Sequence, residues 1–453
     1  MAERYDLVII GGGPGGYETA LFAAEKGMKT ALVEERELGG TCLNRGCIPT
    51  KTLLHASSAF RKIPGLVSSG ICVGEVSADM HQMRQHKDET VEKLRGGIAQ
   101  LMKMKKVAVY RGRGVITGPG SVAVTGETEA ELECGNILIA TGSEPSLPPI
   151  PGIELPGVVT SDGILDNGER LGSLIIIGGG VIGMEFASIY SDLGTEVTVI
   201  EALDRILATI DKDAAQNLKP ILKRRGVTIQ TGARVAQILA GPDGKPGCRY
   251  TQKDKEFEIY ADRVLVAVGR RPVTKGLFAE GFSVGTERGR ILVNERYETS
   301  VPGIYAAGDV IGGIQLAHVA SAEGINAVCA MLGEAPRYMM DAVPSCVYTD
   351  PEIAAVGLSQ EEAEQRGIPV TVAKYVMNSN AKTILTGQER SFIKIIARED
   401  DHKILGAVLM CTNATDMIPQ FVQAIDSGLT LEDCRKVIYP HPTFVEGVKD
   451  ALQ

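Results

Sequence analysis

Cys42 and Cys47 form the one close cysteine pair of the chain, within the stretch GGTCLNRGCIPTK at residues 39–51. Inside a regular α-helix such a pair would have Cα atoms about 8 to 9 Å apart, too far for a disulfide. A bridge needs a distorted stretch, which Gly46 permits, and Pro49 suits the opening of a helix from residue 50 onward. A small constrained loop favours a reducible bond. On the residues alone, two unpaired thiols or half of a metal site stay open, although metal pairs prefer shorter spacings.

A glycine-rich turn just upstream has the pattern of a dinucleotide-binding unit. An apolar run at residues 5–10 predicts a strand, Gly11, Gly13 and Gly16 form GxGxxG, and alanines at helical spacing follow over residues 15–26. Glu34 comes 23 residues after Gly11, at the end of a second apolar run. Such sites place a carboxylate there, on a ribose hydroxyl, while the glycines let the backbone approach the pyrophosphate.

The same unit recurs at residues 174–201, with Gly178, Gly180 and Gly183 followed by Glu201. Two fingerprints in one chain predict two bound dinucleotides. A redox pair beside two dinucleotides suggests electron transfer between a thiol substrate, a flavin and a nicotinamide. Glu201 would repel a ribose 2′-phosphate, which favours NAD over NADP, but the nearby Arg205 counts against that preference.

Length and composition bound the remaining possibilities. A chain of 453 residues suggests about three domains, and its 44% hydrophobic and 23% charged residues are ordinary for a globular protein. The net charge of −9 argues against binding to nucleic acid or an anionic membrane. We find no apolar run of membrane-spanning length and no signal-peptide pattern, and nine mostly scattered cysteines fit a reducing compartment. These features predict a cytoplasmic protein.

Several long motifs give the chain a resemblance to the pyridine nucleotide-disulfide oxidoreductases over essentially its whole length, and most closely to the dihydrolipoamide dehydrogenases among them. The motifs follow the family's order: the cysteine segment at 39–51, ATG at 140–142, VGRRP at 268–272, YAAGD at 305–309, LAH at 316–318, TDPEIAAVG at 349–357 and HPTFVE at 441–446.

The resemblance implies an α/β architecture with two Rossmann-like domains and a C-terminal α+β interface domain. It places a discontinuous FAD domain at residues 1–145 and 270–340, an NAD domain at 146–269 and the interface domain, which forms a homodimer, at 341–453. A cluster of prolines at residues 145–151 supports a linker before the second nucleotide unit.

The resemblance also assigns catalytic roles. His441 becomes an acid-base residue, oriented by Glu446 and contributed to the cysteines of the other subunit, whereas without the motif it would be taken for a structural or surface histidine. Lys51 and Glu185 become a charge pair beside the flavin, although each alone would be interpreted as a snorkelling surface group.

Cofactor contacts follow from the fingerprints and the resemblance together. For FAD they are Gly11, Gly13, Gly16, Glu34, Thr41, Cys42, Lys51, Gly114, Thr141, Gly142, Ser143, Asp309, Gln315, Leu316, Ala317 and His318. For NAD they are Gly178, Gly180, Val181, Ile182, Gly183, Glu185, Glu201, Val235 and Gly269. No HExxH, paired CxxC or EF-hand pattern occurs, so no metal is predicted.

The implied activity is oxidation of protein-bound dihydrolipoamide to lipoamide with NAD+, within a 2-oxo acid dehydrogenase or glycine cleavage complex, with the lipoyl group carried by another protein. The alternatives are an NADH-dependent reductase of another disulfide, and a non-catalytic flavin or NADH sensor. Cys42, Cys47, His441 and Glu446 together argue against a sensor, which would not need all four.

Two departures from the family pattern bear on the thiol substrate. Arg45 stands inside the cysteine loop where a small apolar residue is common, and its charge is expected to lower the pKa of a neighbouring thiol. Phe444 and Val445 replace a more usual Leu-Ser, which predicts a more apolar substrate entrance.

Overall fold

The computed structural model describes residues 3–241 and 243–453. Met1 and Ala2, in the predicted FAD domain, and Pro242, in the predicted NAD domain, lie outside these residues. The chain divides into two compact units. The first unit comprises the chain up to Thr52, Arg84–Ser146 and Gly269–Tyr338, and the second comprises Leu53–Met83, Leu147–Val268 and Met339–Gln453. This is a different partition from the three predicted domains, which stay a prediction.

The first unit is built on a seven-stranded sheet in the order β3-β2-β1-β6-β5-β4, with β19 paired to β6. The central strands β1, β2 and β6 are parallel, whereas β4, β5 and β6 form an antiparallel meander. The strands are β1 (Glu3–Ile10), β2 (Thr30–Glu34), β3 (Ala108–Arg111), β4 (Arg113–Gly118), β5 (Ser121–Thr125), β6 (Ala130–Ile139) and β19 (Ile304–Ala306).

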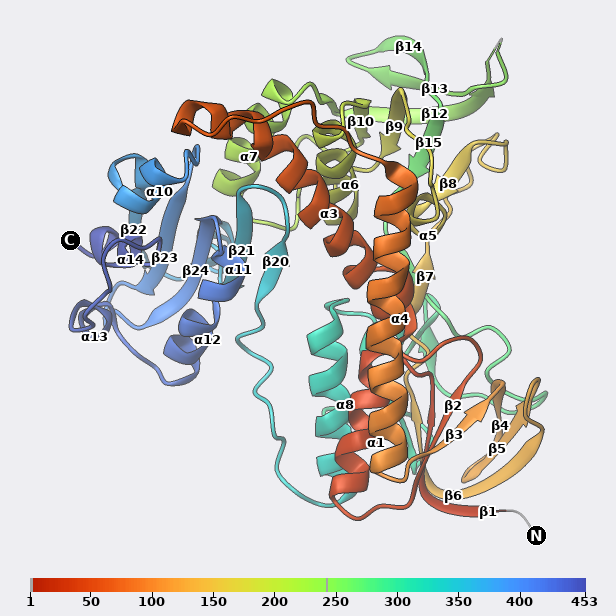
Figure 1. Cartoon of the computed structure of the whole chain (residues 1–453). Helices are drawn as coiled ribbons and strands as arrows, with labels where there is room; N and C mark the ends of the chain where they lie inside the picture. Colours follow the sequence, from red (N-terminus) through yellow and green to blue (C-terminus); the bar gives the residue numbers. More distant parts are fainter. Residues whose placement is uncertain (1–2, 242) are drawn as a thin grey trace. The chain divides into compact units, whose positions relative to one another are not determined.

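Alternating side chains of β1 face two separate cores. Leu7 and Ile9 pack into one apolar cluster together with residues of helices α1, α4 and α8, whereas Val8 and Ile10 pack into another cluster on the opposite face. Figure 1 shows α1 (Pro14–Glu25), α4 (Met80–Met104) and α8 (Ala317–Met331) lying beside this sheet. Both faces of this parallel strand are covered, which explains why β1 is apolar at successive positions and not only at alternate ones.

Short elements complete the first unit. They are α2 (Gly40–Arg45), the first part of α3 (Cys47–Lys62), β7 (Ser143–Pro145), which pairs with β16 (Arg270–Pro272), the hairpin β17 (Thr286–Glu287) and β18 (Arg290–Ile291), and the 3-10 helix η2 (Gly308–Ile311).

The second unit contains a five-stranded parallel sheet in the order β11-β10-β9-β15-β8. Its strands are β8 (Val158–Thr160), β9 (Ser173–Ile177), β10 (Glu196–Glu201), β11 (Thr228–Thr231) and β15 (Arg263–Val266), with helices α5 (Ser161–Leu165), α6 (Val181–Asp192) and α7 (Lys212–Arg224). A three-stranded antiparallel sheet follows: β12 (Ala233–Ala240), β13 (Pro246–Gln252) and β14 (Lys255–Tyr260). Between residues 53 and 83 the unit also contains the 3-10 helix η1 (Ile63–Ser69).

An antiparallel sheet in the order β20-β21-β24-β23-β22 forms the C-terminal part of the second unit. Its strands are β20 (Ser345–Val347), β21 (Glu352–Gly357), β22 (Val370–Val376), β23 (Phe392–Arg398) and β24 (Ile404–Cys411). Its helices are α9 (Gln360–Gln365), η3 (Met377–Ser379), α10 (Ala381–Leu385), α11 (Ala414–Met417), α12 (Pro419–Asp426), α13 (Leu431–Arg435) and α14 (Glu446–Ala451). Within residues 3–241 and 243–453, no helix combines the length and apolar character needed to cross a membrane.

Candidate active site

The cysteine pair lies at a break between two helices of the chain. Cys42 is on α2 and Cys47 is the first residue of α3, and Gly46 separates them with φ −139° and ψ −107°. The distorted stretch predicted from the spacing is therefore present. The prediction that the following helix starts at residue 50 is wrong, because α3 begins at Cys47. Pro49 is accommodated in its first turn, where backbone N–H groups lack intrahelical acceptors.

Both cysteines are half-buried thiols in this structure. A hydrogen bond with Cys47, reinforced by burial, raises the pKa of the Cys42 thiol far above its ordinary value, while the charge of Lys51 acts to lower it. Such a pair holds a proton between its sulfurs in the dithiol state, and one of the thiols must lose its proton before it can act as a nucleophile.

Arg45 forms an ion pair with a nearby carboxylate. Its guanidinium donates to Glu37 Oε2 from Nη1 at 2.9 Å and from Nη2 at 2.6 Å. Glu37 compensates the positive charge, and Lys51, not Arg45, is the cation that lowers the pKa of Cys42. Arg45 therefore connects α2 with the segment after β2, and its predicted effect is not among the causes that shift the pKa of Cys42.

The first glycine turn forms a cradle at the N-terminus of α1. Gly11 has φ 108°, and a Cβ there would lie 2.3 Å from the Ala140 carbonyl oxygen, so only glycine fits. A Cβ at Gly16 would lie 1.8 Å from the Gly11 carbonyl oxygen. Gly13 caps α1 without a side-chain hydrogen bond, so no side chain blocks the N-terminus of the helix, where the positive end of the helix dipole attracts an anion.

Glu34 closes this cradle at the end of β2. Its Oε2 accepts from the Gly12 N–H at 2.6 Å and its Oε1 accepts from the Arg36 N–H at 2.7 Å. Burial raises the pKa of this carboxyl despite both bonds. Gly114 on β4 packs against the last residue of β1, since a Cβ there would lie 3.0 Å from Ile10 Cγ2. The cradle and its acid fit the pyrophosphate and ribose of a dinucleotide such as FAD.

The second cradle repeats this geometry in the second unit. Gly178 has φ 113°, and a Cβ there would lie 2.3 Å from the Ala267 carbonyl oxygen, while a Cβ at Gly183 would lie 2.0 Å from the Gly178 carbonyl oxygen. Gly180 caps α6, and a Cβ there would meet no atom within 4 Å. Glu201 Oε2 accepts from the Gly179 N–H at 2.5 Å. The second set of residues fits a dinucleotide such as NAD.

The other predicted FAD contacts also belong to the first unit, and one hydrogen-bond network there is centred on Ser143. Its hydroxyl is hydrogen bonded to Asp309 and accepts from Arg270 Nε at 2.8 Å. Thr141 Oγ1 donates to the Val273 carbonyl at 2.7 Å, and Gly142 has φ 69°. Thr41 lies on α2, Gln315 and Leu316 precede α8, and Ala317 and His318 open that helix.

Arg270 and Glu323 contact predicted or neighbouring residues of the FAD site, although the sequence analysis did not name either of them. Glu323, on α8, accepts from the Gly308 N–H at 2.7 Å, and burial together with Asp309 raises the pKa of its carboxyl to about 7. Arg270 lies inside the VGRRP motif, and this motif could have indicated it as a site residue. Glu323 had no such signal, because its contact depends on a glycine 15 residues away.

The remaining predicted NAD residues come from helix α6, from strand β12 and from the chain after β15. Val235 is on β12, Gly269 follows β15 with φ 128°, and Val181 and Ile182 open α6. Glu185, also on α6, has 3% of its surface exposed and accepts from the Tyr348 N–H at 3.1 Å. Lys51 belongs to the first unit, so its pairing with Glu185 stays a prediction.

His441 and Glu446 form a dyad in the second unit. His441 Nδ1 lies 2.9 Å from Glu446 Oε1, and Glu446 Oε2 also accepts from the Thr443 N–H at 2.9 Å. These two bonds, the backbone one first, lower the pKa of the Glu446 carboxyl. The histidine side chain is 72% exposed, whereas that of Glu446 is 16% exposed. The carboxylate therefore fixes the ring at Nδ1 and leaves Nε2 for an external partner.

Phe444, which lies between these two residues, does not widen an apolar entrance. It is 5% exposed and packs into the apolar core beneath the antiparallel sheet, with Val445 partly buried beside it. The prediction that Phe444 makes the substrate entrance more apolar is wrong, because its ring serves the core.

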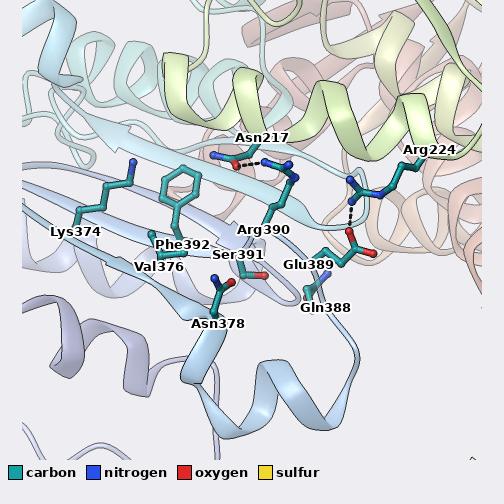
Figure 2. Close-up of a pocket in the computed structure, with 10 residues that line it drawn as sticks. All are labelled: Asn217, Arg224, Lys374, Val376, Asn378, Gln388, Glu389, Arg390, Ser391 and Phe392. Atoms are coloured by element: carbon teal, nitrogen blue, oxygen red, sulfur yellow. Dashed lines mark hydrogen bonds and ion pairs between the residues drawn. The ribbon is translucent and has the colours of Figure 1, made fainter.

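A cavity of about 540 Å³ lies in the second unit between α7 and strands β22 and β23. Figure 2 shows Arg390 reaching Asn217 and Arg224 reaching Glu389 across it. None of the predicted site residues lines this cavity. Among the described residues, no group of three or more His, Cys, Asp or Glu side chains could hold a metal ion.

Comparison with known proteins places this site in a family. The model of the family described as pyridine nucleotide-disulphide oxidoreductase matches residues 5–324, and that of its dimerisation domain matches residues 343–452. A protein named dihydrolipoyl dehydrogenase from Bacillus subtilis is 40% identical to this chain, and the match covers 100% of this chain and 98% of the relative. A protein of the same name from Chlamydia muridarum is 41% identical, and the match covers 98% of this chain and 96% of the relative.

A solved structure of a flavoprotein disulfide reductase has a similar fold. The HOCl-induced flavoprotein disulfide reductase RclA from Escherichia coli superimposes with a TM-score of 0.88 at 31% identity, covering 99% of each chain. Fold and matches together define an oxidoreductase that uses FAD and NAD. The chain belongs to the pyridine nucleotide-disulfide oxidoreductase family, with a C-terminal dimerisation domain. The predicted family, fold class and cofactors are confirmed.

Proposed function

We propose that this protein is a dihydrolipoyl dehydrogenase, which oxidises protein-bound dihydrolipoamide to lipoamide with NAD+ as the final acceptor. The observation that carries the proposal is the hydrogen-bonded Cys42–Cys47 pair, held at a helix break in the same unit as the first glycine cradle. The full-length similarity to proteins of that name supports the choice of substrate.

The thiol chemistry begins with proton transfer to His441. Thiolate, not thiol, attacks a disulfide, so the substrate needs a base. The hydrogen bond between His441 Nδ1 and Glu446 fixes the ring and stabilises the positive charge that it gains when Nε2 takes the proton. In the proposed homodimer, His441 serves the cysteine pair of the other subunit, and its high exposure within its own chain is consistent with that role.

The oxidation proceeds by two exchanges at sulfur. The substrate thiolate attacks Cys42 of the oxidised pair, the bond between the two cysteines breaks, and Cys47 leaves as a thiolate. The second substrate thiol, after losing its proton, attacks the substrate sulfur of the mixed disulfide and releases Cys42. One dithiol has become a disulfide, and the cysteine pair has gained two electrons.

Bound FAD and NAD+ supply the two-electron chemistry that returns the pair to its oxidised state. Gly11, Gly13 and Gly16 would hold FAD at the first cradle, with Glu34 at its ribose, and Asp309 at a further hydroxyl. Gly178, Gly180, Gly183 and Glu201 would hold NAD in the same way. Lys51 and Glu185 are proposed as a charge pair beside the flavin.

The partner and the domain boundaries belong to the same proposal. The lipoyl group would arrive on another protein, either an acyltransferase core or the carrier of a glycine cleavage system. The division into an FAD domain at 1–145 and 270–340, an NAD domain at 146–269 and an interface domain at 341–453 belongs to the proposal. The cytoplasmic location stays a prediction from the sequence.

Anaerobic stopped-flow absorbance tests the proposal. The oxidised FAD protein is mixed with dihydrolipoamide and then with NAD+, and we expect a long-wavelength band from a thiolate beside the flavin that decays as NADH forms. If dihydrolipoamide leaves the flavin spectrum unchanged while NADH reduces it, the substrate assignment fails and the alternative of another disulfide substrate takes its place.

A further inference from the structure

The loop after β10 borders the second cradle. Leu207 N–H donates to the Gly179 carbonyl at 2.8 Å, and Glu201 Oε1 accepts from the Leu203 N–H at 2.7 Å. Residues 201–207 are therefore held against the glycine turn at both ends. The acid at the end of such a strand faces the adenosine ribose, so this loop lies where a 2′-phosphate would be accepted or rejected.

Arg205 is the one cation of residues 201–211. In sites of this type an arginine near the ribose accommodates the 2′-phosphate of NADP, whereas a carboxylate selects the free hydroxyl of NAD. Glu201 and Arg205 therefore have opposite effects on coenzyme choice. An unrestrained guanidinium would offset the repulsion by Glu201.

In the structure the guanidinium of Arg205 is bound by acceptors outside the cradle. Arg205 Nη1 donates to Glu361 Oε1 at 3.0 Å and to Oε2 at 3.1 Å, and Nη2 donates to the Ala208 carbonyl at 3.1 Å. Glu361 lies in the first turn of α9, whose start is fixed by a capping box between Ser359 and Glu362. The acceptor therefore comes from a well-defined helix in the matched dimerisation region.

We propose that Glu361 determines coenzyme selectivity: by pairing with Arg205 it withdraws that guanidinium from the ribose edge of the second cradle and leaves Glu201 to reject NADP. Glu361 is a positioning residue, since it acts through Arg205. The inference rests on the proposed binding of NAD at this cradle, and it does not depend on the thiol substrate.

Calorimetric titration of the oxidised, FAD-loaded protein with NAD+ and with NADP+ tests the inference without turnover. For Glu361→Gln we expect NADP+ to bind about 10-fold more tightly, because a charged hydrogen-bond donor is released, while the Kd for NAD+ changes less than about 2-fold. Glu361→Ala, which leaves no acceptor at all, should show the same gain.

Two further variants distinguish the effect of Glu361 on Arg205 from the effect of removing one negative charge anywhere on helix α9. Glu364→Gln removes the same charge from the same helix, where Glu364 pairs with Gln360, and should leave both affinities unchanged. The double variant Arg205→Gln with Glu361→Gln should lose the gain, because the gain requires Arg205.

Unchanged NADP+ affinity in both Glu361 variants, or an equal gain for NAD+ and NADP+, would overturn the inference. A gain that persists in the double variant would also overturn it. Absence of NAD+ binding to the wild-type protein would instead defeat the proposed function, and the inference with it.

Discussion

His441 Nδ1 and Glu446 Oε1 lie 2.9 Å apart, with the carboxylate held at the start of α14 by a second bond from the Thr443 N–H. The side chain of Glu446 is mostly buried while the imidazole is mostly exposed, so the acid serves as the fixed part of the dyad. This geometry predicts an orienting role that can be separated from cofactor binding.

Replacing Glu446 by Gln should lower dihydrolipoamide turnover about 10- to 100-fold, because an amide cannot stabilise the imidazolium that forms when the histidine takes a proton. Steady-state kinetics measure the loss. Reduction of the flavin by NADH should keep its wild-type rate, since that reaction does not use the histidine. Asp450→Asn, on the same helix, serves as the control and should retain turnover. A Glu446→Gln enzyme with normal turnover would contradict the role.

Replacing either Cys42 or Cys47 by Ser should reduce dihydrolipoamide turnover by about 1,000-fold or more, because both sulfurs are needed for the exchange. FAD should remain bound, since the first cradle is made of backbone glycines and Glu34. The flavin absorbance of the purified variants measures this. Cys72→Ser is the matched control, because Cys72 is exposed and distant in sequence from the pair. Retained turnover in the Cys47→Ser enzyme would sink the assignment of the pair.

The sequence was sufficient for the parts of the fold that depend on local pattern. Gly11 and Gly178 each follow a β-branched run and precede a helix, and the structure forms both cradles there. The break at Gly46 was likewise predictable, because an i, i+5 pair cannot bridge along a regular helix.

What the sequence missed were contacts of charged and aromatic side chains with residues from other elements. Arg45 pairs with Glu37, and Arg205 pairs with Glu361 from a helix far along the chain. Phe444 faces the core although its motif suggested the site. Spacing along the chain carries no information on which acid meets which cation across the fold.

Replacing Glu323 by Gln should stabilise the FAD-loaded protein at pH 8 and leave its stability unchanged near pH 4.5. Burial raises the pKa of this carboxyl from 4.5 to about 7, so the folded protein binds its proton more tightly than the unfolded chain does. Stability therefore falls as the pH rises from about 4.5 to 7, by roughly 1 to 3 kcal/mol, and Gln removes this loss.

Melting temperatures of the two proteins between pH 4.5 and 8 measure the Glu323 effect. The exposed Glu280→Gln serves as the control and should follow the wild-type curve. Parallel curves for Glu323→Gln and wild type would mean that the carboxyl does not carry the predicted proton.

Lys394 and Lys374 both donate to Asp213 Oδ2 at 2.9 Å, but they differ in burial, with side chains 4% and 34% exposed. Lys394 also pairs with Asp211 at 2.7 Å, and the side chain of Asp211 is 1% exposed.

Replacing Lys394 by Met should lower the free energy of unfolding by about 3 to 5 kcal/mol, because it leaves a buried carboxylate without its cation. Replacing Lys374 by Met should cost less than about 1 kcal/mol, since solvent screens that pair. Both variants remove one positive charge and insert the same side chain, so differential scanning calorimetry of the two proteins compares the buried lysine with its two carboxylates and the more exposed lysine with one. Equal losses in the two proteins would show that Asp211 finds another partner or is itself protonated.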